Sequence, residues 1–303
     1  MRKEFRFLFF FLPLMLSPVL GYGSPRPIDF SRHEGASGIT ASVQYKPAIP
    51  YFGGFSIGDS SGKTLKTYAA KKEGDVDGKN SESFVESKYD PRYERSTDKF
   101  SVSLGYSTGM IRFEAEGLYH EFIVDKANFS NVKNAQTFAM SKSDTQAAAS
   151  SSSASAGSSP AKPSNTLPDY YVTATNEGIS VTSLLGNVCY DIIPAEIKLS
   201  PSVCAGAGMS FIKFLGVTNR RTSYQGKVGI QYFLSSRSVI FASAYVHKIV
   251  RGKFEKIPVT HHKKPATAGG NTNTNAIEHL YPSANLETAY LGVECGIRLI
   301  FSL

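Results

Sequence analysis

Three charged residues at alternate positions, Arg112, Glu114 and Glu116, have the spacing in this sequence that is most suggestive of chemistry. Side chains two residues apart in a strand share one face. Two carboxylates on one face resemble the paired acids of general acid–base catalysis. Pairing with Arg112 or with Arg298 is the better interpretation, because buried charges need partners of opposite sign and both signs are available. We therefore expect a structural charge cluster rather than a catalytic pair.

Other chemical sets in the sequence are weaker. His120 and His247, with Asp125 and several serines, have the residue types of a hydrolytic set, but no nucleophile motif accompanies them. Residues 206–208 read Gly-Ala-Gly inside an expected strand with no helix after it, unlike a phosphate-binding loop. The pair at 261–262, His-His, lacks the cysteines or paired carboxylates of a metal site and is expected to be solvated. The sequence therefore predicts no enzyme, no cofactor and no bound metal.

Strands with one apolar face would position the charged residues. Residues 291–303 show the pattern best, because Val293 and Ile297 alternate with Glu294 and Arg298. This alternation is typical of a strand in a closed barrel whose outer side meets lipid. Hydrophobic residues make up 41% of the chain, too few for a bundle of membrane helices.

Seven further stretches alternate in a similar way, and the sequence predicts an all-β fold, an antiparallel transmembrane β-barrel of about eight strands. The alternation changes phase within 178–190, which indicates a bulge. Residues 291–303 should close the barrel against 38–45, because an unpaired edge in lipid costs several kcal/mol for each amide. The expected strands are 38–45, 100–107, 111–120, 178–190, 197–211, 224–234, 239–250 and 291–303.

The connections between these strands differ in length, as in bacterial membrane barrels with short periplasmic turns and long external loops. Long connections usually carry function or disorder. The second one contains a low-complexity Ser/Ala tract at 147–160. We expect extracellular loops at 46–98, 125–177, 216–221 and 251–285, and periplasmic turns at 107–109, 191–196 and 235–237.

The inward face of an eight-strand barrel is just wide enough to be filled by side chains. Charged residues on that face are expected to meet as a lumen cluster, either a structural plug or a pore lining. Cys189 and Cys204 flank one expected turn and form either a disulfide or two small thiols, while Cys295 falls on the lipid face. The expected lumen cluster comprises Arg112, Glu114, Glu116, Lys198, Lys227, Glu294 and Arg298.

Residues 1–23 have the features of a cleaved signal peptide, with a basic start, an apolar core and small residues before the cleavage region. The mature chain, 24–303, is then exported to the bacterial outer membrane. The formal net charge is +8 with a pI of about 9.2, but no dense basic helix is present. Nucleic acid is therefore not an expected partner.

Several short motifs also resemble those of one protein family. They span most of the expected barrel and follow one another in the same order as in that family. The chain resembles the Anaplasma/Ehrlichia-type bacterial surface antigen family, which are major outer-membrane proteins and porin-like in some members. That resemblance implies an outer-membrane barrel with variable surface loops that contact antibodies. The Ser/Ala tract and the basic loop at 251–285 depart from the family pattern. The motifs are Tyr-Lys-Pro at 45–47, Phe-Gly-Gly-Phe-Ser at 52–56, Gly-Tyr-Ser at 105–107, Asn-Val-Cys-Tyr-Asp at 187–191, Leu-Ser-Pro-Ser-Val-Cys-Ala-Gly at 199–206, Ser-Tyr-Gln-Gly-Lys-Val-Gly at 223–229, His-Lys at 247–248 and Gly-Ile-Arg-Leu-Ile-Phe at 296–301.

Three functions are compatible with these patterns. The leading hypothesis is a surface antigen, a barrel displaying loops to host molecules and antibodies, because the loops rival the barrel in length. The alternative is a porin passing small hydrophilic solutes, which would require more strands, recruited from 64–70 and 83–89. A soluble secreted β-sandwich is the third. The first two predict outer-membrane lipid and the barrel-assembly machinery as partners.

Overall fold

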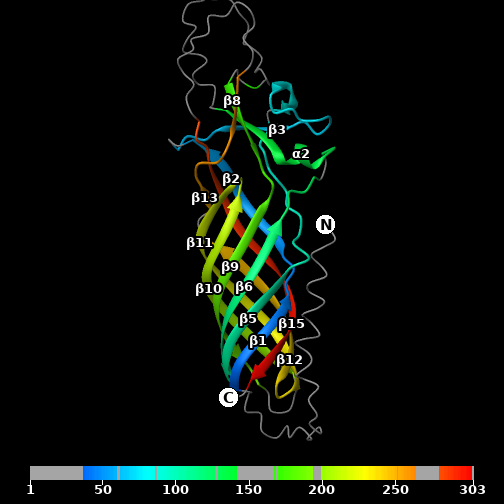
Figure 1. Cartoon of the computed structure of the whole chain (residues 1–303), viewed down its shortest axis with the longest axis vertical. Coiled ribbons are helices and arrows are strands. Elements are labelled where there is room, and N and C mark those ends of the chain that lie inside the picture. Colours follow the sequence, from blue (N-terminus) through cyan, green and yellow to red (C-terminus); the bar gives the residue numbers. More distant parts are fainter. Residues whose placement is uncertain are drawn as a thin grey trace, which may run out of the picture. The chain divides into compact units, whose positions relative to one another are not determined.

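The computed structural model describes residues 37–59, 62–85, 87–126, 129–141, 167, 170–193, 199–250, 252–263 and 280–301. Within this part, eight antiparallel strands close into a ring, which confirms the predicted all-β barrel (Figure 1). No helix among the described residues is long and apolar enough to cross a bilayer. The ring runs in the order β1 (Ser37–Tyr45), β5 (Phe100–Thr108), β6 (Ile111–Phe122), β9 (Ile179–Asp191), β10 (Leu199–Phe214), β11 (Val217–Ser235), β12 (Ser238–Ile249) and β15 (Ser283–Phe301).

The closing pair of the ring is β1 with β15, in a register that runs from Ile39 opposite Phe301 to Tyr45 opposite Cys295. This confirms the expected closure. A further strand, β2 (Ile49–Gly58), continues along β15 where β1 stops, with Ile49 opposite Leu291. Closure leaves no open sheet edge in the ring, so the backbone amides are paired as a hydrocarbon environment demands.

Alternation divides the barrel wall into an apolar outside and a polar inside. Val293 and Ile297 of β15 are 62% and 56% exposed, whereas Glu294 and Arg298, which follow them in sequence, are buried. The same apolar outward face appears on every other strand of the ring, as the sequence predicted. Such a wall suits lipid outside and side-chain packing inside.

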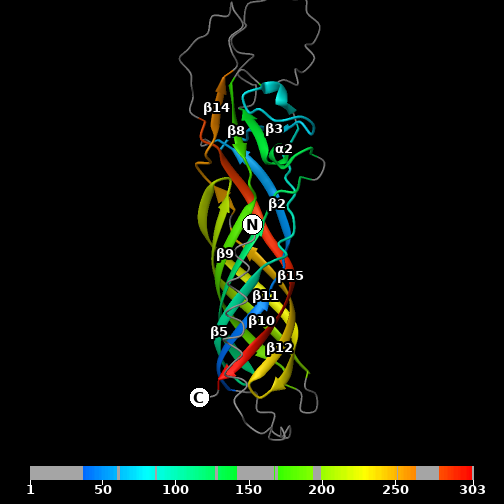
Figure 2. The ribbon, with the colours of Figure 1, turned by 45° about the vertical axis from the view of Figure 1, so that its right-hand side comes forward.

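A second, five-stranded sheet, here called the cap, is built from three of the long connections between barrel strands. The first connection supplies β3 and β4, the second β7 and β8, and the third β14. Figure 2 shows these strands beyond one end of the barrel. The cap strands are β14 (Thr260–Lys263), β8 (Tyr170–Thr175), β7 (Thr137–Ser141), β3 (Lys66–Ala70) and β4 (Phe84–Val85); the same connections hold η2 (Ser81–Ser83), α2 (Val132–Gln136) and β13 (Lys253–Phe254).

One apolar core joins the cap to the adjacent end of the barrel. Phe138 of the cap and Phe214 of β10 both pack on Phe55, with ring centroids 6.3 and 6.1 Å away. Ile179 and Val181 of β9 point inward into this same core. The cap is therefore packed on the barrel by burial of apolar surface, not merely tethered to it.

Several boundaries differ from those predicted. The phase change in 178–190 is not a bulge, since β9 pairs with both neighbours without a register shift. Its apolar residues swap faces because the lumen itself becomes apolar near the cap. The loop expected at 216–221 is mostly strand, with a two-residue turn at Leu215 and Gly216. Residues 64–70 and 83–89 supply β3 and β4 to the cap, and no described residue of these ranges adds a strand to the barrel.

Candidate functional site

Two lysines and two glutamates form a closed ring of ion pairs at the centre of the lumen. Lys46 Nζ lies 2.5 Å from Glu116 Oε1 and 2.9 Å from Glu294 Oε2. Lys227 Nζ lies 2.8 Å from Glu116 Oε2 and 3.0 Å from Glu294 Oε1. Each charge thus has two partners of opposite sign. All four side chains are at most 5% exposed, so the ring lies out of contact with bulk water.

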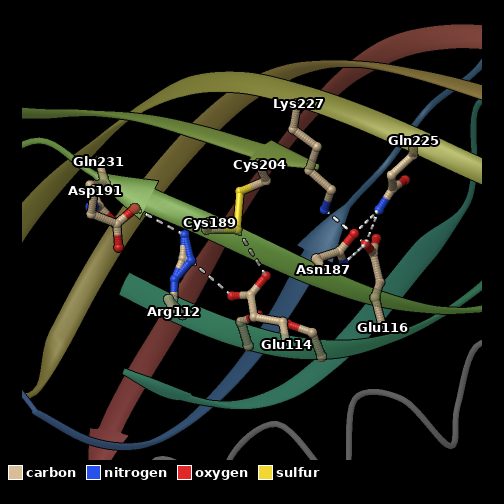
Figure 3. Close-up of a disulfide and its surroundings, with 12 residues drawn as sticks. Arg112, Glu114, Glu116, Asn187, Cys189, Asp191, Cys204, Gln225, Lys227 and Gln231 are labelled. Atoms are coloured by element: carbon tan, nitrogen blue, oxygen red, sulfur yellow. Dashed lines mark hydrogen bonds and ion pairs between the residues drawn. A yellow bond between two sulfur atoms is a disulfide. The ribbon is translucent and has the colours of Figure 1, made fainter. Parts of the chain in front are cut away.

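Neutral side chains complete the coordination of Glu116 (Figure 3). Gln225 Nε2 and Asn187 Nδ2 donate to Glu116 Oε2 at 2.6 and 3.0 Å, and Ser101 Oγ donates to Oε1 at 3.2 Å. These donors come from β11, β9 and β5, so one carboxylate links distant parts of the wall. A buried charge strongly destabilises a fold unless it is paired and hydrogen-bonded in this way.

A second charge cluster lies nearer the turn end of the barrel. Arg112 donates from Nη1 to Glu114 Oε1 at 3.1 Å and from Nη2 to Asp191 Oδ1 at 3.2 Å. Arg298 Nη2 lies 3.4 Å from Glu114 Oε1, and its Nη1 donates to Gln231 Oε1 at 2.9 Å. With the central ring, four lumenal cations face four carboxylates, so the charges of these two clusters balance.

A disulfide between Cys189 and Cys204 crosses from β9 to β10 on the lumen side of the wall. The two residues lie directly opposite each other in the strand register. Figure 3 shows the disulfide between the two charge clusters, close to Glu114 and Lys227. Cys295 is free and exposed on the lipid-facing wall.

An aromatic layer separates the central ring from the apolar core below the cap. The ring of His247 stacks on Tyr290 with centroids 4.6 Å apart, and His120 contacts the same ring at 4.9 Å. Tyr245 places its ring 4.4 Å from Lys46 Nζ and donates its hydroxyl to the Pro47 carbonyl at 2.8 Å. The lumen is therefore filled in sequence by two charge clusters, an aromatic layer and an apolar core.

Six of the seven residues expected in the lumen cluster are buried inside the barrel and take part in these two clusters, while Lys198 lies outside the described residues. Sequence reasoning missed Lys46 and Asp191, which were assigned to a loop and a turn. Both continue the inward alternation of their strands by one step, Lys46 after Gln44 and Asp191 after Cys189. Extending each strand by one residue would have found them.

The outer surface of the molecule presents the cap. The two histidines of β14 are held by β8: His261 Nδ1 lies 2.5 Å from Tyr170 Oη, and His262 Nε2 lies 2.8 Å from Thr173 Oγ1. Burial lowers the pKa of His262 below its usual value. The described residues contain no group of three or more His, Cys, Asp or Glu side chains arranged to hold a metal ion. The two histidine side chains therefore join β14 to β8 by hydrogen bonds.

Comparison with known proteins gives the following matches. A family model described as "Surface antigen" matches residues 32–301. Major surface antigen 4 of Anaplasma marginale is 26% identical over 283 residues, which cover 92% of this chain and 90% of that protein. Among solved structures, Neisserial surface protein A is 13% identical with a TM-score of 0.37, covering 88% of this chain and 100% of its own. The attachment invasion locus protein of Yersinia pestis is 10% identical with a TM-score of 0.28, covering 87% and 99%.

Proposed function

We propose that this chain, which belongs to the Surface antigen family, is a non-conducting outer-membrane barrel that presents its folded cap to host molecules and antibodies. Family membership confirms the resemblance seen in its short motifs. The chain is accordingly a surface antigen of the bacterial outer membrane.

The observation that carries the proposal is the construction of the cap. Its strands come from three connections that leave the same end of the barrel, and they pair with each other. Tyr89 from the first connection donates its hydroxyl to the Ala135 carbonyl of the second at 3.0 Å. Thr173 in the second bonds His262 in the third at 2.8 Å. These contacts make the connections one folded surface, which is suited to recognition.

The porin alternative receives less support from the lumen. A porin needs a continuous aqueous path, and eight-strand barrels leave an interior just wide enough for side chains. Here Lys227 of β11 meets Glu116 of β6 across the lumen, 2.8 Å apart, and Tyr290 above them is fully buried. We therefore expect the barrel to be closed to sugars and amino acids.

Two further expectations belong to the same proposal. We propose no catalytic role, since His120 and His247 are packed against Tyr290 inside the barrel, remote from any substrate outside. We also propose that residues 1–23 are removed on export and that the barrel-assembly machinery inserts the mature chain. Determining the N-terminal residue of the protein purified from membranes tests the cleavage.

Labelling of single cysteines in whole cells tests the orientation. In a Cys295→Ser background, Glu82→Cys places a thiol in the cap and Arg237→Cys places one in the opposite turn. A membrane-impermeant maleimide should label Glu82→Cys on intact cells and Arg237→Cys only after lysis. The reverse pattern would contradict display of the cap.

Liposome swelling distinguishes a non-conducting barrel from a porin. Vesicles containing the refolded protein should swell in arabinose no faster than protein-free vesicles, with a known porin as the positive control. Rapid swelling by the folded, heat-modifiable protein would favour the porin function instead.

A further inference from the structure

The outer wall of the barrel ends in a cluster of positive charge on one side. On β10 the outward apolar series reaches Phe211 and is followed by Lys213; on β12 it reaches Val246 and is followed by Lys248. On β11 the series reaches Tyr224 and is followed by Thr222 and Arg220. Lys213, Arg220 and Lys248, here called the basic rim, are all exposed.

The basic rim lies on three adjacent strands. Arg220 is directly opposite Phe211 in the β10–β11 register, and Lys248 is directly opposite Tyr224 in the β11–β12 register. Each cation therefore borders the aromatic end of the apolar wall. Among the described residues, no carboxylate forms an ion pair with any member of the rim.

The other side of the wall has a different charge at this level. The first outward charge beyond the apolar series on β6 is Glu121, which is paired with Lys99 at 3.7 Å. On β15 it is Glu287. Among the described outward residues of the ring strands at this level, cations without an ion-pair partner therefore lie on β10, β11 and β12. If these cations served only to keep the end of the barrel hydrated, they would not need to lie on one side of it.

Position along the wall identifies the chemistry that these cations meet. A membrane-spanning strand needs about 9–11 residues, and the outward apolar series on β11 runs from Leu234 to Tyr224. The next residues lie at the depth of lipid headgroups on the side of the long connections. Long cationic side chains at that depth extend toward phosphate, and each contributes to attraction for anionic lipid.

We propose that the basic rim is a binding site for the phosphate-bearing headgroups of anionic lipids in the outer leaflet. The inference rests on the membrane orientation proposed above. The site would collect such lipids on the β10–β12 side of the barrel and leave the β6 and β15 sides without them.

Spin-labelled lipids test the proposal. Full-length mature protein is refolded into phosphatidylcholine vesicles that contain a trace of spin-labelled phosphatidylglycerol or spin-labelled phosphatidylcholine, and electron paramagnetic resonance gives the relative association of each. The wild-type protein should prefer phosphatidylglycerol. In the variant Lys213→Gln/Arg220→Gln/Lys248→Gln that preference should fall by about threefold or more, and in the wild type it should fall with added salt.

The control variant Lys71→Gln/Lys72→Gln/Arg92→Gln removes the same charge from exposed positions in the first connection. It should keep the wild-type preference. Equal loss in both variants would show a response to net charge and would overturn the site, as would an unchanged preference in the rim variant. Whole-cell labelling of Glu82→Cys in the rim variant checks the orientation independently. If the cap is not displayed at the cell surface, that result is recognised separately from a loss of lipid binding. If the triple variant does not fold, as judged by heat-modifiable migration, the single change Lys248→Gln and the salt titration decide.

Discussion

The ammonium group of Lys46 reaches across β5 to the carboxylate of Glu116 on β6, 2.5 Å away, so two strands that are not hydrogen-bonded neighbours are joined inside the barrel. Lys46 directly follows β1, in the short segment that separates β1 from β2. Its side chain therefore fixes the inside of the wall where backbone pairing is interrupted.

Replacing Lys46 with methionine should destabilise the barrel strongly. The change leaves Glu116 and Glu294 buried with one cation fewer, and breaking a buried pair in this way costs about 3–5 kcal/mol. Urea titration of the refolded protein, followed by far-ultraviolet circular dichroism, measures the loss. The double variant Lys46→Met/Glu294→Gln restores charge balance around Lys227 and should recover part of the stability. Full stability in the single variant would contradict the ring of ion pairs.

Removing the disulfide should destabilise the barrel less than breaking the ion-pair ring. Cys189 and Cys204 are 15 residues apart in sequence, and closing a loop of that size stabilises a chain by about 3 kcal/mol. Cys189→Ser/Cys204→Ser should lower the urea midpoint accordingly, and Cys295→Ser on the lipid face is the control expected to leave it unchanged. Thiol counting in denaturant without reductant should find one free thiol in the wild type; three would rule out the disulfide.

An arginine on the lipid face should report its depth. Ile297 is 56% exposed, and Arg at the bilayer midplane costs about 2–4 kcal/mol, falling to about 0–1 near the interface. Ile297→Arg should therefore unfold at a lower urea concentration than Thr222→Arg, a matched change at the end of the apolar wall. Equal effects of the two changes would argue against the assigned membrane position.

Acidic pH should loosen the edge of the cap. Burial lowers the pKa of His262 in the folded cap, so folding favours the neutral ring that meets Thr173 Oγ1. The stabilising contribution is present above the unfolded pKa of about 6.5 and is lost as pH falls below that value. Amide exchange in β14, corrected for intrinsic rate, should be faster at pH 5.5 than at pH 7.5. His262→Gln should remove most of this pH dependence, and a wild-type edge that does not respond would contradict it.

Alternation was sufficient to predict the barrel because one rule acts on every spanning strand. Lipid selects the outward residue and the filled lumen selects the inward one, as at Val293 and Glu294. The rule failed where its environment changed. Ile179 and Val181 point inward into the apolar core, so the apolar residues of β9 change phase although the strand itself is regular.

The cap could not be predicted in the same way. All five residues of β7 are buried, so this strand has no alternation, and it pairs with β3 from a different connection. Such pairing depends on contacts between residues far apart in sequence, which a single short segment does not encode. In β2, Pro50 together with Gly53 and Gly54 obscures the strand pattern.

The three-part origin of the cap also bears on immunity. At two places in the cap, β14 beside β8 and β7 beside β3, neighbouring strands come from connections separated by whole barrel hairpins; Thr260 of β14, for example, lies opposite Thr173 of β8. An antibody footprint spanning those strands is discontinuous, and a linear peptide from one connection reproduces only a fragment of it. Immunisation with the folded barrel is therefore the way to elicit antibodies that recognise the assembled cap.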